Sequence, residues 1–280
     1  MLTQRTMYTS LISFMTYLMK RISVRASILA LVILYLCSCT TPPKTEKETV
    51  SKRPEITIQV ASINLANFNK RIERNNIIEL AKVLKNEQVE ILAVQGISRY
   101  PGVASRVDFV NELSTKTEWS NVFGEMLNIS GKQTGNAVFS VYPILSHQNI
   151  SWDMVITKSF DAALQATIDA GARPLTLIST QLPPKATANE QAQCSKLLAA
   201  MNSELKDQLA IVAGNMPTDE IMSSANSFAV VPPPEPAKST ISRIWYSANT
   251  SIQLLASRSV ETDLGTLVIA QFGLSRLQKQ

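Results

Sequence analysis

The chain has 280 residues, of which 45% are hydrophobic and 18% are charged, so it is too apolar for a disordered chain and can bury a large core. Its three Cys and single His exclude a disulfide framework, a four-Cys zinc site and any mechanism that needs two His. The formal net charge is +5, but residues 1–38 hold four of the 27 basic residues and no acidic one. The remaining 23 basic and 22 acidic residues nearly balance, so the charge gives no strong signal for nucleic-acid binding.

The first predicted element is a signal segment over residues 1–38. Residues 26–36 are uncharged and apolar, which is shorter than the about 20 residues of a membrane-spanning helix and typical of a signal peptide core. Three basic residues precede this run, as in a signal peptide: Lys20, Arg21 and Arg25. Met19 stands directly before them, and we interpret it as the true start of the protein.

The segment Leu36-Cys37-Ser38-Cys39 resembles the bacterial lipobox, with Leu at −3, a small residue at −1 and Cys at +1. The resemblance implies cleavage after Ser38 and lipid attachment to Cys39, which anchors the chain in a membrane of the bacterial cell envelope. Thr40 at the next position, in place of Asp, favours the outer membrane, facing the periplasm. The alternatives are an uncleaved signal anchor and, less well matched, lipidation of Cys37.

Residues 39–54 follow as a predicted tether. From Thr40 to Pro54 this segment contains three Pro, mixed charges and one apolar residue, so it cannot form a core. The alternative is an N-terminal arm that packs on the domain.

Residues 55–274 carry the periodicities of a folded domain, and residues 275–280 form a tail. Alternating or continuous apolar runs predict strands near 56–63, 89–94, 119–123, 136–140, 144–152, 162–168, 175–181, 209–213, 228–231, 241–246, 252–255 and 266–272. Helical spacing predicts helices over 76–84, around 107–113 and over 186–205. Many strands with few helices favour an α/β domain built as a sandwich of sheets covered by helices.

Five segments, in order along the chain, resemble the endonuclease/exonuclease/phosphatase superfamily, which includes DNase I. They are Val60-Ala61-Ser62-Ile63-Asn64, Ile91-Leu92-Ala93-Val94-Gln95-Gly96, the run from Gly135 to Ile144 with its Tyr-Pro-Ile turn, Leu177-Ile178-Ser179-Thr180-Gln181-Leu182, and Val212-Ala213-Gly214-Asn215-Met216-Pro217. The resemblance implies a DNase I-like β-sandwich of two facing mixed sheets flanked by helices. It also implies metal-assisted hydrolysis of phosphate esters, with carboxylates holding Mg²⁺ and two His beside the reacting phosphate.

The same resemblance shows that the catalytic set is degenerate. The family's metal-binding Glu falls on Gly96, its catalytic His on Gln181, its Asp and Asn on Asn215 and Pro217, an acid on Trp245 and its closing His on Leu264. Asn64 alone keeps the expected type, and Asp263 matches the closing Asp only after a one-residue shift. The single His, His147, follows the Tyr-Pro-Ile turn outside the expected site, and we interpret it as an exposed or hydrogen-bonded loop residue.

These substitutions favour a non-catalytic, membrane-anchored module with no catalytic residue and no cofactor, which binds an unknown protein or a phosphorylated ligand. The alternative is an active phosphodiesterase or nuclease that uses Mg²⁺ at a rebuilt site. Its candidate groups are Asn64, Gln95, Gln181, Asn215 and Asp263.

Three further features of the sequence give weaker indications of function. Cys194 is interpreted as a small buried hydrophobe because no His is placed to activate it. The proline-rich segment Val231–Pro236 is interpreted as a stiff loop, with docking into an aromatic groove as the alternative. Lys238, Arg243 and Arg258 are too scattered to predict a phosphate-binding patch.

Overall fold

The structure is a computed structural model that describes residues 56–66, 68, 71–100, 106–151, 162–171, 173–181, 205, 208–215, 228–232, 242–249 and 251–275. The chain divides into two units, and all described residues lie in the second, Lys52–Gln280. The predicted signal segment, the tether, Cys39, Cys194 and nearly all of the predicted 186–205 helix lie outside the described residues. Within the described ranges, no helix is both long enough and apolar enough to cross a membrane.

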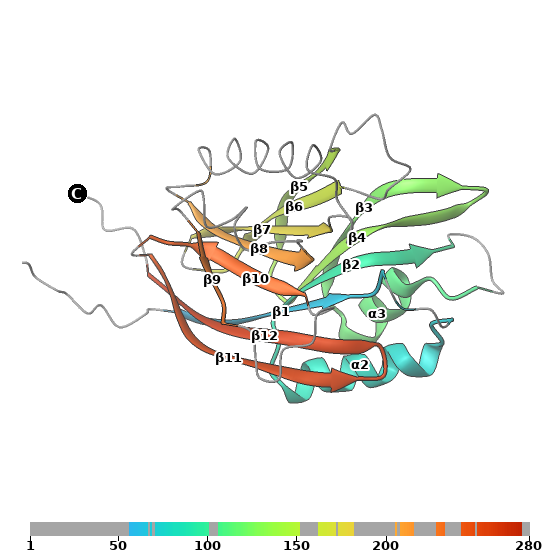
Figure 1. Ribbon diagram of the computed structural model, residues 1–280, viewed down its shortest axis with the longest axis horizontal. Coiled ribbons are helices and arrows are strands. Elements are labelled where there is room, and N and C mark those ends of the chain that lie inside the picture. Colours follow the sequence, from blue (N-terminus) through green and yellow to red (C-terminus); the bar gives the residue numbers. More distant parts are fainter. Residues whose placement is uncertain are drawn as a thin grey trace, which may run out of the picture. The chain divides into compact units, whose positions relative to one another are not determined.

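Twelve strands form two sheets of six strands each (Figure 1). The first sheet has the order β11 (Ile252–Thr262), β12 (Gly265–Leu274), β1 (Ile56–Asn64), β2 (Ile91–Arg99), β4 (Lys132–Ser140), β3 (Ser120–Ile129). The second has the order β5 (Ile144–Ser151), β6 (Ala162–Asp169), β7 (Pro174–Gln181), β8 (Leu209–Asn215), β10 (Arg243–Ser247), β9 (Phe228–Val230).

Each sheet has one parallel pair of strands at its centre and antiparallel strands on both sides. The parallel pair is β1 with β2 in the first sheet and β7 with β8 in the second. All other neighbours pair antiparallel. The prediction of two facing mixed sheets is therefore confirmed, and the two sheets repeat one pattern of strand directions.

The two sheets pack face to face through a continuous apolar core. Successive side chains of a strand point to opposite faces, so Ile58 and Val60 of β1 reach this core together with Leu175 and Leu177 of β7. All four side chains are fully buried. Burying each one stabilises the fold by about 1.5–3 kcal/mol relative to an exposed position.

Helix α2 (Arg74–Asn86) covers the other face of the first sheet. Its buried residues Ile77, Leu80 and Leu84 recur at the three- and four-residue spacing that forms one helical face. At the start of the helix the Asn76 side chain accepts from the Glu73 backbone N–H at 3.0 Å, and the Asn76 N–H donates to the Glu73 carbonyl at 3.1 Å. The predicted helix over 76–84 is confirmed.

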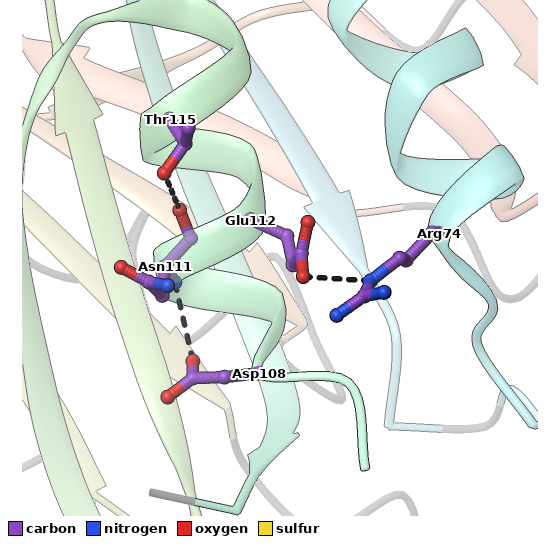
Figure 2. Close-up of polar contacts among 5 residues, drawn as sticks. All are labelled: Arg74, Asp108, Asn111, Glu112 and Thr115. Carbon is purple, nitrogen blue, oxygen red and sulfur yellow. Dashed lines mark hydrogen bonds and ion pairs between the residues drawn. The ribbon is translucent and has the colours of Figure 1, made fainter. Parts of the chain in front are cut away.

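Helix α3 (Phe109–Thr117) packs beside α2 and is fixed by three polar contacts, which Figure 2 shows. Asp108 caps its start by accepting a hydrogen bond from the Asn111 backbone N–H at 3.2 Å. Thr115 Oγ1 donates to the Asn111 carbonyl at 2.7 Å, and Arg74 Nε donates to Glu112 Oε1 at 2.8 Å. The salt bridge joins the first turns of the two helices across their contact.

The structure differs from the predicted elements in several places. Strand β2 ends at Arg99, β3 ends at Ile129 and β4 begins at Lys132, whereas the pattern predicted 94, 123 and 136. Strand β11 extends to Thr262, whereas the pattern predicted an end at 255, because its second half is an edge with polar, partly exposed side chains. Helix α3 begins at Phe109, not at Val107, because Asp108 caps it. His147 is exposed, as predicted, but it lies on the edge strand β5 opposite Ala166 and not in a loop.

Candidate functional site

The four central strands end at the same side of the sandwich. In the first sheet Asn64 lies opposite Gln95, and in the second Gln181 lies opposite Asn215. The two pairs belong to parallel strands, whose carboxyl ends meet at one edge of a sheet. The structure therefore brings together four of the positions that the sequence nominated, at the end of the sandwich where the resemblance places the active site.

Just below this edge lies a cluster of neutral polar side chains, which we call the polar cluster: Ser62, Gln95, Asn136, Ser179 and Ser242. Gln95 is its centre and is fully buried. Its Nε2 donates to Ser62 Oγ at 3.2 Å, to Ser179 Oγ at 3.1 Å and toward the Ala213 carbonyl at 3.4 Å. Its Oε1 accepts from Ser242 Oγ at 3.1 Å. One amide thus joins strands of both sheets.

The remaining members of the polar cluster complete the network. The Ser62 and Ser242 hydroxyls are 2.5 Å apart, and either can donate. Ser179 Oγ donates to the Val94 carbonyl at 3.2 Å, while Asn136 Nδ2 donates to the Ser179 carbonyl at 3.2 Å. The cluster contains only amides and hydroxyls, so it satisfies buried hydrogen-bonding groups and offers neither a charge nor a base.

Most residues of the polar cluster were not predicted from the sequence, although a signal was present. Ser62 stands two residues after Val60, and Ser179 stands two residues after Leu177. Both Ser residues therefore continue the alternation that faces the inter-sheet core. Polar residues at the strand positions that alternate toward the core are the sequence pattern that would have identified this network.

Backbone fills the space beside Gly96 into which the side chain of a metal-binding Glu would extend. Gly96 has a positive φ of +68°, and the pairing of β2 with β4 shifts register around it, between Val94 and Ile97. A Cβ on Gly96 would lie 2.5 Å from the Ala66 Cβ and 2.7 Å from the Ala66 nitrogen. The chain after β1 fills the space from which a side chain at position 96 would extend.

Asn64, the one residue of the expected type, is turned toward its own chain. Its Oδ1 accepts a hydrogen bond from the Ala66 backbone N–H at 2.9 Å. Its Nδ2 is buried and has no hydrogen-bond partner in the described part of the chain. A metal ion would need the oxygen of this amide, one of whose two lone pairs is engaged by the Ala66 N–H.

The other degenerate positions also hold no acid or base. Gln181 Oε1 is buried without a hydrogen-bond partner among the described residues. Trp245 is 1% exposed, and Leu264 is 2% exposed in the core beneath the helices. Asp263 lies exposed in the turn between β11 and β12. For Asn215 only the backbone is described, and Pro217 lies outside the described residues.

The described residues do not fit a Mg²⁺ ion. This cation prefers oxygen ligands and is usually held by carboxylates. Among the described residues, no group of three or more His, Cys, Asp or Glu side chains is placed to hold a metal ion. Position 96 lacks a ligand, and the Asn64 oxygen is engaged by Ala66.

No family model matches the sequence, and no curated protein matches it. Solved structures do match: an endonuclease/exonuclease/phosphatase from Beutenbergia cavernae has a TM-score of 0.63 at 15% identity, over 80% of this chain and 72% of that protein. The chain has the endonuclease/exonuclease/phosphatase fold.

Two further neighbours with this fold have names or ligands that indicate their chemistry. The human Nocturnin catalytic domain with a bound sulfate anion has a TM-score of 0.57 at 16% identity, over 78% of this chain and 95% of that one. D. rerio TDP2, complexed with a single-strand DNA product, has a TM-score of 0.56 at 12% identity, over 77% and 98%. At such identities the endonuclease/exonuclease/phosphatase fold is the shared property, and the residues of each chain decide the chemistry.

Proposed function

We propose that this chain is a non-catalytic relative of the endonuclease/exonuclease/phosphatase enzymes and works as a binding or scaffold module. The contact between Gly96 and Ala66 carries the proposal, because it puts backbone where the metal-binding carboxylate would begin. The engaged oxygen of Asn64 and the neutral polar cluster around Gln95 support it.

The proposal also agrees with the size of the expected kinetic effect. Removing a single general acid or base typically costs about 10²–10⁴ in rate. Here the positions of the metal ligand, the catalytic His and the closing His hold Gly96, Gln181 and Leu264. Groups that act as one catalytic unit are not additive when removed, but little remains when nearly all are absent.

We further propose that the module is anchored through Cys39 in a membrane of the bacterial cell envelope, with the domain facing the periplasm. The support is the apolar run over residues 26–36, the three basic residues before it and the Leu36-Cys37-Ser38-Cys39 junction. In this setting the module binds a protein or a phosphorylated ligand that it does not cleave.

Hydrolysis of bis-p-nitrophenyl phosphate and plasmid DNA by the full-length chain in Mg²⁺ tests the non-catalytic proposal. We expect rates equal to those without protein. The matched control is Asn64→Ala, which removes the only side chain of the expected metal-site type. Hydrolysis by the wild-type chain that Asn64→Ala abolishes would overturn the proposal in favour of an active phosphodiesterase or nuclease. Activity that is equal in both proteins and stays with the chain through further purification would indicate a rebuilt site without Asn64 and would also overturn the proposal.

A further inference from the structure

A cavity of about 260 Å³ opens beside Gly96. Its apolar wall is formed by residues that also pack in or against the core beneath the helices, among them Leu65, Ile72 and Val107. Gly96 itself belongs to the lining, so the position that lacks a carboxylate forms part of the cavity wall. An apolar wall with a few polar groups is the usual composition of a small-molecule site.

Three cations from separate segments line this cavity. Arg71 precedes α2, Arg106 precedes α3, and Lys132 begins β4. Two aromatic side chains, Phe68 and Tyr100, line it as well. No Asp or Glu belongs to the lining in the described part of the chain, so its charge is positive.

Contacts within the chain engage Asp108, the acidic residue closest to Arg106 in the sequence. Asp108 caps α3 and pairs with Arg99, whose Nη2 lies 3.2 Å from the Asp108 carboxylate. By contrast, the Arg106 guanidinium lies over the Tyr100 ring, 5.4 Å from its centroid, a contact that leaves its N–H groups available to an oxyanion.

We propose that this cavity binds a small phosphorylated organic compound. Arg106 and Lys132 hold the phosphate, and the organic part lies against Phe68 and Tyr100. Guanidinium groups bind phosphate oxygens in a fork, and an ammonium adds a point charge. The inference rests on the proposed function. A module that binds a phosphorylated ligand without cleaving it can hold the phosphate through side-chain cations alone, without a metal ion.

The volume of the cavity restricts the size of the ligand. Sites for drug-sized molecules measure about 300–1,000 Å³, so a cavity of about 260 Å³ admits a compound the size of a sugar phosphate or a mononucleotide. A phospholipid headgroup has the same phosphate chemistry, and the experiment below separates it from a soluble ligand.

The test is calorimetric titration of the full-length chain with adenosine monophosphate at low ionic strength, where exposed charges are least screened. We expect saturable binding that Arg106→Gln weakens at least about tenfold. Lys116→Gln is the matched control, because Lys116 is an exposed cation in the last turn of α3 and does not line the cavity. It should change the affinity less than twofold, and thermal melting should show that both variants are folded.

Two further arms identify the ligand chemistry. Phe68→Leu should weaken binding of adenosine monophosphate and leave that of inorganic phosphate unchanged, since only the nucleotide has a ring to stack. Phosphatidylglycerol vesicles serve as the lipid probe. Saturable binding to these vesicles that depends on Arg106, without binding of adenosine monophosphate, would overturn the assignment to a soluble ligand.

The inference fails if adenosine monophosphate does not bind, or if Arg106→Gln and Lys116→Gln weaken binding equally. Its failure is distinct from that of the proposed function. Release of phosphate from bound adenosine monophosphate in Mg²⁺, dependent on the protein, would overturn the non-catalytic proposal and leave the binding site in place.

Discussion

Gly96 and Ala66 face each other where β2 passes the end of β1: a Cβ on Gly96 would stand only 2.5 Å from the Cβ of Ala66. Real Cβ atoms do not approach this closely, and the opposing atoms include backbone, which cannot rotate away. Position 96 therefore lacks a metal ligand for two reasons, the identity of its residue and the course of the chain after β1. Restoring the carboxylate requires a different loop as well as a different residue.

Gly96→Ala should destabilise the fold more than Gly131→Ala. Both glycines have positive φ, +68° and +81°, but a Cβ on Gly131 would meet nothing within 4 Å. Left-handed backbone costs a residue with a side chain about 1–2 kcal/mol at both positions, and overpacking adds about 1–3 kcal/mol at Gly96 alone. Urea unfolding of the two variants measures the difference. Equal losses would contradict the close contact with Ala66.

Gly96→Glu should give no phosphodiesterase activity in Mg²⁺. The new carboxylate would have no second acidic ligand within the described residues, and its backbone would be strained. The assay is the hydrolysis of bis-p-nitrophenyl phosphate, with thermal melting to identify the folded fraction. Activity in a folded Gly96→Glu protein would show that one residue is the whole defect.

Gln95→Leu should cost about 1–3 kcal/mol of unfolding free energy, because three buried hydroxyls each lose one of their two hydrogen-bond partners. The affected hydroxyls are those of Ser62, Ser179 and Ser242. The control is Gln148→Leu, an exposed Gln on β5 that should change stability by less than about 0.5 kcal/mol. Equal unfolding midpoints in urea would show that the polar cluster contributes no stability.

Arg258→Lys should destabilise the edge of the first sheet although it keeps the charge. Arg258 Nε donates to Glu87 Oε2 at 2.8 Å, and its Nη2 lies 2.9 Å from both the Glu87 carbonyl and Gln59 Oε1. A lysine cannot reproduce this fork, so a loss of about 1–2 kcal/mol is expected, as for hydrogen bonds of a charged group. Lys82→Gln breaks an exposed pair with Glu79 and should cost at most about 0.5 kcal/mol. Chemical denaturation compares the two, and a smaller effect of Arg258→Lys would refute the expectation.

Tyr142 should make the fold sensitive to alkaline pH. Burial, together with a 2.6 Å hydrogen bond to Glu90 and the charge of that residue, raises the pKa of the Tyr142 hydroxyl well above its usual range. The folded protein therefore retains a proton that the unfolded chain loses above about pH 10. The contribution is complete below that pH and is lost as the pH rises further. Stability should fall less steeply with pH in Tyr142→Phe, and equal slopes in unfolding curves above pH 10 would contradict this account.

Cys39→Ala should release the protein from membranes and stop its labelling by a palmitate analogue. A lipid chain contributes about 0.8 kcal/mol per buried CH₂, so two or three chains account for firm attachment. Cys37→Ala is the matched control, since Leu36 stands before Cys37 where the lipobox has a small residue. Unchanged labelling of Cys39→Ala would refute the lipoprotein assignment.

The sequence predicted the central strands well because their side chains have a strong pattern. Val60 and Ala93 follow the alternation and the apolar run of buried strands, and both are fully buried. The second half of β11 was missed because its residues are polar and its pairing with β12 is set by the turn at Asp263. Edge strands of this kind are determined by their partner more than by their own composition.

The candidate site could be predicted from sequence only as a set of missing groups. Motif order indicated that Gly96 stands where a carboxylate is expected, but not that Ala66 occupies the space beside it. The cavity was missed for a similar reason. Its cations, Arg71, Arg106 and Lys132, come from three separate segments, and their spacing in the sequence does not indicate that they meet.

Strand β12 has a consequence for how the chain acquires its fold. It pairs with β1 from Ile56 to Ser62, with Leu274 opposite Ile56, so this pairing can form only when the last described strand is present. Contacts between such distant segments close late and slow the folding of a domain. The first sheet cannot be completed while residues near 274 are still being synthesised, and the domain folds only after its chain is finished.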